Sequence, residues 1–116
     1  MPGSADVSHQ MRTREHRNNA GQLTGFEFSN LIITRNGVQR VVKRIPGVSI
    51  TKSTRSWRWS ADDDFLYFTL NGHTFFAEEP YGDSDCYCVF AKDSTDIPEI
   101  GVVRNEFEKH RVWRVI

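Results

Sequence analysis

Hydrophobic and polar residues begin to alternate along the chain at Phe26, with the period of two that is typical of β-strands. Two Asn-Gly pairs, Asn36-Gly37 and Asn71-Gly72, interrupt this alternation. An Asn-Gly pair favours a two-residue hairpin turn, because both central residues of a type I′ turn need a positive φ. The pattern therefore predicts two β-hairpins, the first over residues 26–45 and the second over residues 65–78.

The second hairpin leads into a third predicted strand near residues 85–91. In the expected register Phe68 faces Phe75 and Leu66 faces Ala77. One face of this meander is apolar enough to be the core, and it carries Leu66, Phe68, Leu70, Phe75, Ala77, Cys86, Cys88 and Phe90. The opposite face carries Phe65, Tyr67, Phe76, Tyr87 and Val89 among polar residues. It is unusually aromatic for a solvated face, so we expect something to cover it.

A helical period of 3.6 appears near the C-terminus, where apolar residues recur at Ile97, Ile100, Val103 and Phe107. Asp96 has the capping-box spacing to Glu99. Gly101 and two valines leave a strand over residues 100–103 as the alternative. With short strands near residues 47–52 and 56–60, the pattern predicts an α+β fold: an antiparallel β-sheet or partial barrel of about six to seven strands with one C-terminal helix.

The chain has 116 residues, a length that suits one domain. Residues 1–24 are polar and we expect them to form a flexible tail, because they offer little apolar surface to bury. Residues 25–116 then form a single globular β-rich domain. No apolar run reaches the about 20 residues of a membrane helix, and no secretory signal is visible, so we expect a cytoplasmic protein with no membrane partner.

The net charge is zero, but its distribution along the chain is uneven. Residues 1–60 hold ten Lys or Arg and three Asp or Glu, a balance of +7, whereas residues 61–116 hold five and twelve, a balance of −7. Such asymmetry favours an interaction surface of one sign. The alternative is that strands from the two halves interleave and their charges compensate each other.

Acidic residues gather where the second hairpin and its following loop are expected to meet. A patch of this kind speeds association with a basic partner, although an ordinary solubilising loop has the same composition. With the two flanking tyrosines, the candidate protein-binding residues are Asp62, Asp63, Asp64, Glu78, Glu79, Tyr81, Asp83, Asp85 and Tyr87.

Basic residues of the first half supply an alternative, nucleic-acid-binding surface, in which cations meet phosphates and exposed Trp57 or Trp59 stacks on a base. The tryptophans share one face of a strand and equally suit a buried face. A neutral chain is also unusual for a nucleic-acid-binding domain. The candidate residues for this alternative are Arg35, Arg40, Lys43, Arg44, Lys52, Arg55 and Arg58.

Cys86 and Cys88 fall at i and i+2 of a predicted strand and therefore share a face. That face is the expected core, where cysteine behaves as a small hydrophobic residue. Only His73, on the same predicted face, can join them, which leaves a zinc set incomplete. We therefore predict no metal, no cofactor and no catalytic residue.

Three functions remain after these considerations. The first is a small, non-enzymatic protein-binding module that grips a basic partner, for instance an inhibitor or immunity-type protein of phage or bacterial origin. The second is a nucleic-acid-binding module. The third is a homodimeric structural subunit that buries the face of Phe65, Tyr67 and Phe76 against a second copy.

Overall fold

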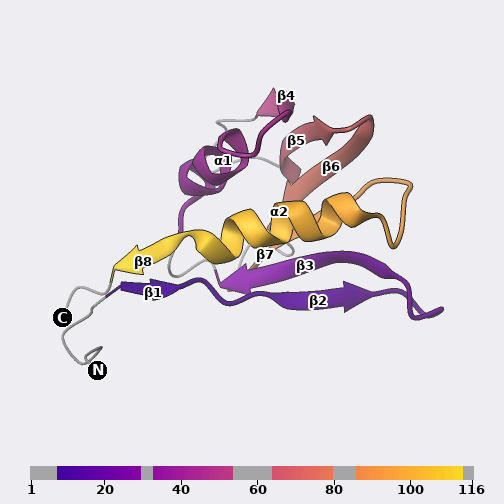
Figure 1. The fold of residues 1–116 in the computed structure, drawn as a ribbon, viewed down its shortest axis with the longest axis horizontal. Coiled ribbons are helices and arrows are strands. Elements are labelled where there is room, and N and C mark those ends of the chain that lie inside the picture. Colours follow the sequence, from indigo (N-terminus) through magenta and orange to yellow (C-terminus); the bar gives the residue numbers. More distant parts are fainter. Residues whose placement is uncertain (1–7, 30–32, 54–63, 80–85, 114–116) are drawn as a thin grey trace.

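The structure is a computed structural model that describes residues 8–29, 33–53, 64–79 and 86–113, without the side chains of residues 8–10 and 111–113. Its main element is an antiparallel six-stranded sheet with the strand order β2-β3-β7-β6-β5-β4 (Figure 1). These strands are β2 Arg14–Arg17, β3 Leu23–Ser29, β4 Ser49–Ser53, β5 Asp64–Leu70, β6 His73–Glu78 and β7 Cys86–Ala91. The predicted α+β class and antiparallel sheet are confirmed, and the sheet is open rather than closed into a barrel.

Two helices and a short strand pair complete the described part of the chain. Helix α1 spans Arg35–Lys43 and helix α2 spans Pro98–Lys109. Strand β1, Ser8–Gln10, pairs with β8, Arg111–Trp113, as a separate two-stranded ribbon. The described residues include no helix that is long and apolar enough to cross a membrane.

The first predicted hairpin is wrong, because residues 35–43 form helix α1. Thr34 caps this helix, with its hydroxyl accepting a hydrogen bond from the backbone N–H of Gly37 at 3.0 Å. The helix places Val38, Val41 and Val42 together in the core, each fully buried. A hairpin would have divided these valines between two faces. Tertiary burial therefore overrides the turn preference of Asn36-Gly37.

Gly37 has a packing role in the helix rather than a turn role. A Cβ atom at this position would lie 2.7 Å from Cγ1 of Ile33, closer than side chains approach each other. The glycine therefore allows the first turn of α1 to fold back onto Ile33. Gly37 is therefore explained by this close approach and not by a hairpin turn.

The second predicted hairpin is confirmed, including its register. Asn71 and Gly72 both have positive φ, 52° and 82°, as a type I′ turn requires. Leu66 pairs with Ala77, Phe68 with Phe75 and Leu70 with His73 across β5 and β6. The positive φ angles that this turn requires thus determined where the β5–β6 hairpin forms.

The predicted phase of the third strand, β7, is wrong by one residue. Ala77 pairs with Val89 and Phe75 pairs with Ala91, so Val89 belongs to the core face with Tyr87. Cys86, Cys88 and Phe90 therefore lie on the opposite face, because a shift of one residue exchanges the faces of a strand. A register irregularity between Asp64 and Leu66 also brings Phe65 into the core, where it is 3% exposed.

Helix α2 is confirmed, but its N-terminus differs from the predicted capping box. Ile97 occupies the N-cap position without a side-chain hydrogen bond, and Pro98 follows it. Asp96 instead has a positive φ of 55° and binds the start of β3. Its carboxylate accepts a hydrogen bond from the N–H of Leu23 at 2.7 Å, and its own N–H donates to the carbonyl of Leu23 at 2.8 Å.

The segment that was expected to be a flexible tail instead contributes strands from residue 8 onward. Residues 14–17 form β2 at one edge of the sheet, and Met11 is buried at 2% exposure. Arg14 pairs with Glu27 and Glu15 with Phe26 across β2 and β3. The residues before β1 lie outside the described part of the chain, as does the strand predicted over residues 56–60.

One hydrophobic core joins both helices to the same face of the sheet, and α2 crosses in front of that face in Figure 1. Phe107 of α2 packs on β3, with ring centroids 5.5 Å from Phe26 and 4.8 Å from Phe28. Val38, Val41 and Val42 bring α1 into the same cluster. The described helices thus leave the second face of the sheet uncovered by any helix, and we call it the helix-free face.

Candidate functional site

Four rings on the helix-free face form a continuous row, which we call the aromatic row: His16 of β2, Phe90 of β7, Phe76 of β6 and Tyr67 of β5. Neighbouring ring centroids are 5.3 Å apart for His16 and Phe90, 5.6 Å for Phe90 and Phe76, and 5.9 Å for Phe76 and Tyr67. All four residues are half-buried. Contacts at these distances are typical of favourable aromatic pairs, so the rings support one another across the sheet.

Gly25 lets the aromatic row cross strand β3 without a ring of its own. The backbone register places Gly25 between His16 and Phe90. A Cβ atom at Gly25 would lie 2.8 Å from Cδ1 of Phe90 and 2.1 Å from the carbonyl oxygen of Val89. Glycine is therefore required here by close approach, and it allows the ring of His16 to reach that of Phe90.

Lysines stand at the Tyr67 end of the row. The Nζ atom of Lys52 is 5.6 Å from the centroid of the Tyr67 ring, and that of Lys92 is 5.9 Å away. Both distances allow cation–π attraction. The Tyr67 hydroxyl donates a hydrogen bond to Asp64 Oδ2 at 2.7 Å. Two lysines and one hydrogen-bonded carboxylate therefore surround the Tyr67 end of the row.

The His16 end of the row contains a second group of polar side chains, which we call the His-Glu-Cys cluster: His16, Glu27 and Cys88. Their ligand-type atoms all lie within 4.8 Å of one another. His16 Nε2 is 2.5 Å from Glu27 Oε1 and 4.0 Å from Cys88 Sγ. Arg14 donates to the other carboxylate oxygen of Glu27, Oε2, at 2.6 Å. The cluster thus spans the adjacent strands β2, β3 and β7.

The surroundings of the cluster lower the pKa of Glu27 and raise that of Cys88. Burial of Glu27 acts to raise its pKa, but hydrogen bonds from Arg14 and His16, with the charges of both groups, outweigh burial and lower it. Burial raises the pKa of Cys88 to about 12, and the neighbouring Cys86 and Glu27 act in the same direction. The cluster without an added ion therefore holds a carboxylate and a protonated thiol at neutral pH.

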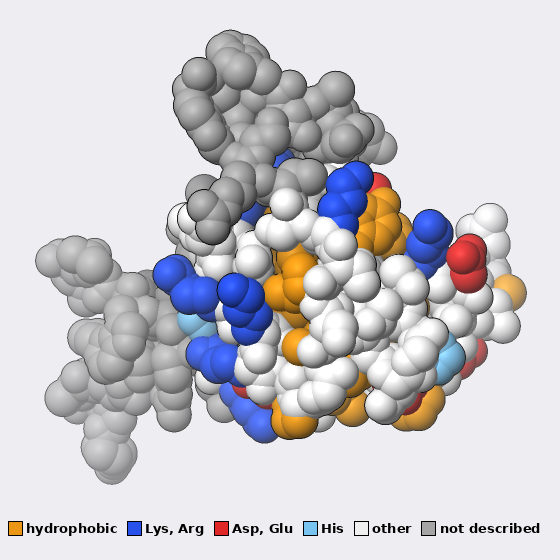
Figure 2. Space-filling model, turned by 90° about the horizontal axis from the view of Figure 1, so that it is seen from above, with side chains coloured by type: hydrophobic (Ala, Val, Ile, Leu, Met, Phe, Trp, Pro, Cys, Tyr) orange, Lys and Arg blue, Asp and Glu red, His pale blue; other side chains and the backbone are white. Residues whose placement is uncertain are grey.

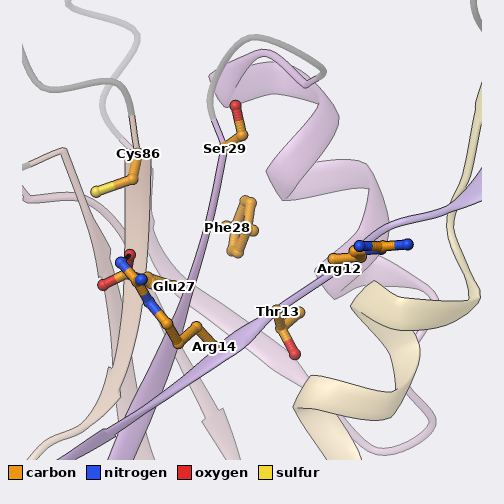
Figure 3. Close-up of a pocket in the computed structure, with 7 residues that line it drawn as sticks. All are labelled: Arg12, Thr13, Arg14, Glu27, Phe28, Ser29 and Cys86. Atoms are coloured by element: carbon orange, nitrogen blue, oxygen red, sulfur yellow. Dashed lines mark hydrogen bonds and ion pairs between the residues drawn. The ribbon is translucent and has the colours of Figure 1, made fainter.

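An open pocket of about 310 Å³ adjoins this cluster at Glu27 and is also lined by Cys86 (Figure 3). The remaining lining residues are Arg12, Thr13, Arg14, Phe28 and Ser29. Arg14 lies against Glu27 in the close-up, while Cys86 stands on the neighbouring strand β7. The pocket therefore opens the edge of the cluster to solvent.

The structure describes only part of the predicted acidic edge. Asp64 and Glu78 lie directly opposite each other on β5 and β6. Glu79 is ion-paired with Arg35 at 2.7 Å. Tyr87 is 6% exposed in the core, so it is withdrawn from the proposed contact residues. The other predicted members, Asp62, Asp63, Tyr81, Asp83 and Asp85, lie outside the described residues.

The predicted basic residues are divided between two surfaces. Arg40 and Lys43 of α1 and Arg44 directly after it are exposed. Figure 2 shows blue Lys and Arg side chains gathered on one side of the molecule. Arg44 contacts Glu106 at 3.6 Å. Burial, then the charges of Arg44 and Arg40, lower the pKa of nearby His110. Lys52 lies by the aromatic row, and Arg55 and Arg58 fall outside the described residues.

Sequence reasoning placed the cysteines on the wrong face and therefore missed the cluster. His73, which was expected to lie with them, contacts Glu99 at 3.8 Å instead. His16 gave no signal because residues 14–17 are uniformly polar and were predicted to be flexible, and Glu27 gave none because it falls at a polar position of the first predicted hairpin. Only the pairing of β2, β3 and β7 brings these three groups together.

A scan against protein-family models found no match, and searches of curated proteins and of solved structures found no similar protein.

Proposed function

We propose that this protein is a non-enzymatic protein-binding module that uses the helix-free face and binds a second copy of its own chain. The single observation that carries the proposal is the aromatic row. Aromatic side chains are enriched at the centres of protein interfaces, where they dominate the binding energy. A row that crosses several strands, and that neither of the described helices covers, supplies such a centre.

The charges around the row favour a protein over a nucleic acid. Lys52 and Lys92 stand at one end, but Glu27 lies on the same face near the other end, and Glu78 lies between. A surface that tracks phosphates is positively charged along its length. Mixed charges around an apolar centre are instead typical of the rim of a protein interface.

The arrangement also suits a second copy of the same chain. In a two-fold symmetric dimer the same patch must be complementary to itself. If the two-fold axis passes near the contact of Phe90 with Phe76, the central rings of one row lie against the same rings of the other. The predicted acidic edge stays a prediction, because most of its members lie outside the described residues.

The test compares the oligomeric state of purified variants by size exclusion with light scattering over a range of concentrations. Tyr67→Glu places a carboxylate in the row, and pairing with Lys52 and Lys92 offsets its repulsion from Asp64, so the fold should tolerate the change. Val102→Glu is the matched control, since Val102 is 47% exposed on α2.

We expect the wild-type chain and Val102→Glu to be dimers and Tyr67→Glu to be a monomer. A wild-type chain that stays monomeric at every concentration, or a Tyr67→Glu variant that still dimerises, overturns the proposal. Measuring binding of a fluorescent single-stranded oligonucleotide at low salt completes the test. Binding that Tyr67→Glu abolishes and Val102→Glu retains would assign the row to nucleic acid instead.

A further inference from the structure

The His-Glu-Cys cluster combines three kinds of side chain that bind transition metals, drawn from three neighbouring strands. Glu27 and Cys88 are directly opposite each other on β3 and β7. His16 comes from β2, where it pairs with Gly25, two residues before Glu27. The regular spacing of a sheet thus holds the three backbone positions in place, and only side-chain rotation adjusts the ligand atoms.

We propose that His16, Glu27 and Cys88 bind a Zn²⁺ ion, with Cys86 as the fourth ligand. Zn²⁺ takes sulfur, imidazole nitrogen and carboxylate oxygen in tetrahedral sites. Mg²⁺ and Ca²⁺ prefer oxygen ligands alone, so a thiol in the set argues against them. The ligand set, rather than any one residue, identifies the ion.

Among His16, Glu27 and Cys88, the distances require only small changes for a zinc ion to fit. Zinc bonds of about 2.3 Å to sulfur and about 2.0 Å to nitrogen imply roughly 3.6 Å between these two ligand atoms in a tetrahedron. Cys88 Sγ and His16 Nε2 are already 4.0 Å apart. His16 Nε2 and Glu27 Oε1 must separate from 2.5 Å to roughly 3.3 Å. Rotation of the half-buried His16 ring provides this movement.

Cys86 and Arg14 complete the site from either side. Cys86 precedes Cys88 by two residues, shares its face of β7, and interacts with its thiol. Two thiolates and one carboxylate around Zn²⁺ carry a net charge of −1, which the guanidinium of Arg14 balances. Arg14 also holds Glu27 Oε2 at 2.6 Å, so Oε1 remains directed toward His16.

The pocket beside the cluster supplies a route for the ion from solvent. Glu27 and Cys86 both line it, and each is one of the four proposed ligands. On binding, the two thiols release their protons to solvent and the imidazole binds as the neutral ring. A structural ion at this position would tie the edge strand β2 to the centre of the sheet.

The experiment titrates Zn²⁺, against a competing chromophoric chelator, into the full chain without a histidine tag and under reducing conditions. Co²⁺ then replaces Zn²⁺, because thiolate-to-cobalt charge-transfer absorption reports a metal–sulfur bond directly. We expect one equivalent of metal and a clear charge-transfer band in the wild-type chain. His73→Gln is the matched control, since this half-buried histidine of the same sheet contacts Glu99 rather than the cluster.

Arg14→Gln should weaken Zn²⁺ binding by about 10–100-fold, as the loss of an outer partner typically does. Cys88→Ser and His16→Gln remove ligands and should weaken it more than Arg14→Gln. Binding that Cys88→Ser and His16→Gln leave unchanged overturns the proposal, and so does a wild-type chain with no cobalt charge-transfer band. The wild-type spectrum decides the question even if a variant fails to fold.

The metal site and the proposed dimer are tested separately. Tyr67 lies at the opposite end of the aromatic row from His16, so Tyr67→Glu should bind Zn²⁺ like the wild-type chain. A monomeric wild-type chain that binds one Zn²⁺ would overturn the proposed function and keep the metal site. A dimeric wild-type chain that binds no Zn²⁺ would overturn the metal site and keep the proposed function.

Discussion

Phe107 attaches helix α2 to the sheet, and its removal tests the packing of the core most directly. The side chain is fully buried, and its ring lies 5.5 Å from that of Phe26 and 4.8 Å from that of Phe28. Phe107→Ala removes both ring contacts and leaves a cavity between the helix and β3. We therefore expect a large loss in the free energy of unfolding.

The expected loss follows from the kind of cavity formed. Replacing a buried phenylalanine by alanine typically costs about 3–5 kcal/mol, and the two aromatic contacts place Phe107 in the upper part of that range. A chain of 116 residues has a total stability of about 6–17 kcal/mol. The substitution should therefore remove a quarter or more of the stability of the folded protein.

The assay is urea unfolding followed by far-UV circular dichroism, analysed with the slope and midpoint of each transition. Val102→Ala is the matched control on the same helix, because Val102 is 47% exposed and should change stability by no more than about 0.5 kcal/mol. If Phe107→Ala costs less than about 1 kcal/mol with an unchanged slope, the packing of α2 on β3 is not as described.

Two further predictions concern the cap of α1 and the ionisation of His110. Thr34→Ala removes the acceptor for the Gly37 N–H and should destabilise the protein by about 1 kcal/mol in thermal unfolding, whereas Thr34→Ser should retain most of the stability; equal losses would contradict the capping role. Burial and the charges of Arg44 and Arg40 lower the pKa of His110, so the folded state favours the neutral ring. The resulting contribution to the stability of the fold is complete above the unfolded pKa of 6.5 and is lost as pH falls through the folded pKa. An NMR titration should show the lowered pKa and its rise in Arg44→Gln, and an ordinary pKa in the wild-type chain would refute the reasoning.

The two Asn-Gly pairs show when a dipeptide is sufficient to predict local structure and when it is not. At Asn71-Gly72 the flanking residues alternate cleanly, and the turn, the pairing and the register all follow. At Asn36-Gly37 the same dipeptide is followed by Val38, Val41 and Val42, whose spacing also suits one face of a helix. The helix forms because it buries all three valines against the core.

The candidate site was less predictable than the fold, because it depends on which strands are neighbours. The aromatic character of the second sheet face was visible in Tyr67 and Phe76. The sequence did not show that Phe90 and Cys88 belong to this face, because their placement depends on a shift of one residue in β7. His16 lies far from both cysteines in the sequence and gave no signal of its own.

The sequence by itself determined those features that depend on neighbouring residues: the β5–β6 hairpin, the helix carrying Phe107, and the α+β class. These follow from backbone conformation and from hydrophobic periodicity, which act over a few residues. The tertiary structure alone decided that residues 14–17 join the sheet, that α1 is a helix, and that His16, Glu27 and Cys88 meet. Each of these depends on burial and strand pairing between segments far apart in the chain, and no local pattern encodes such contacts.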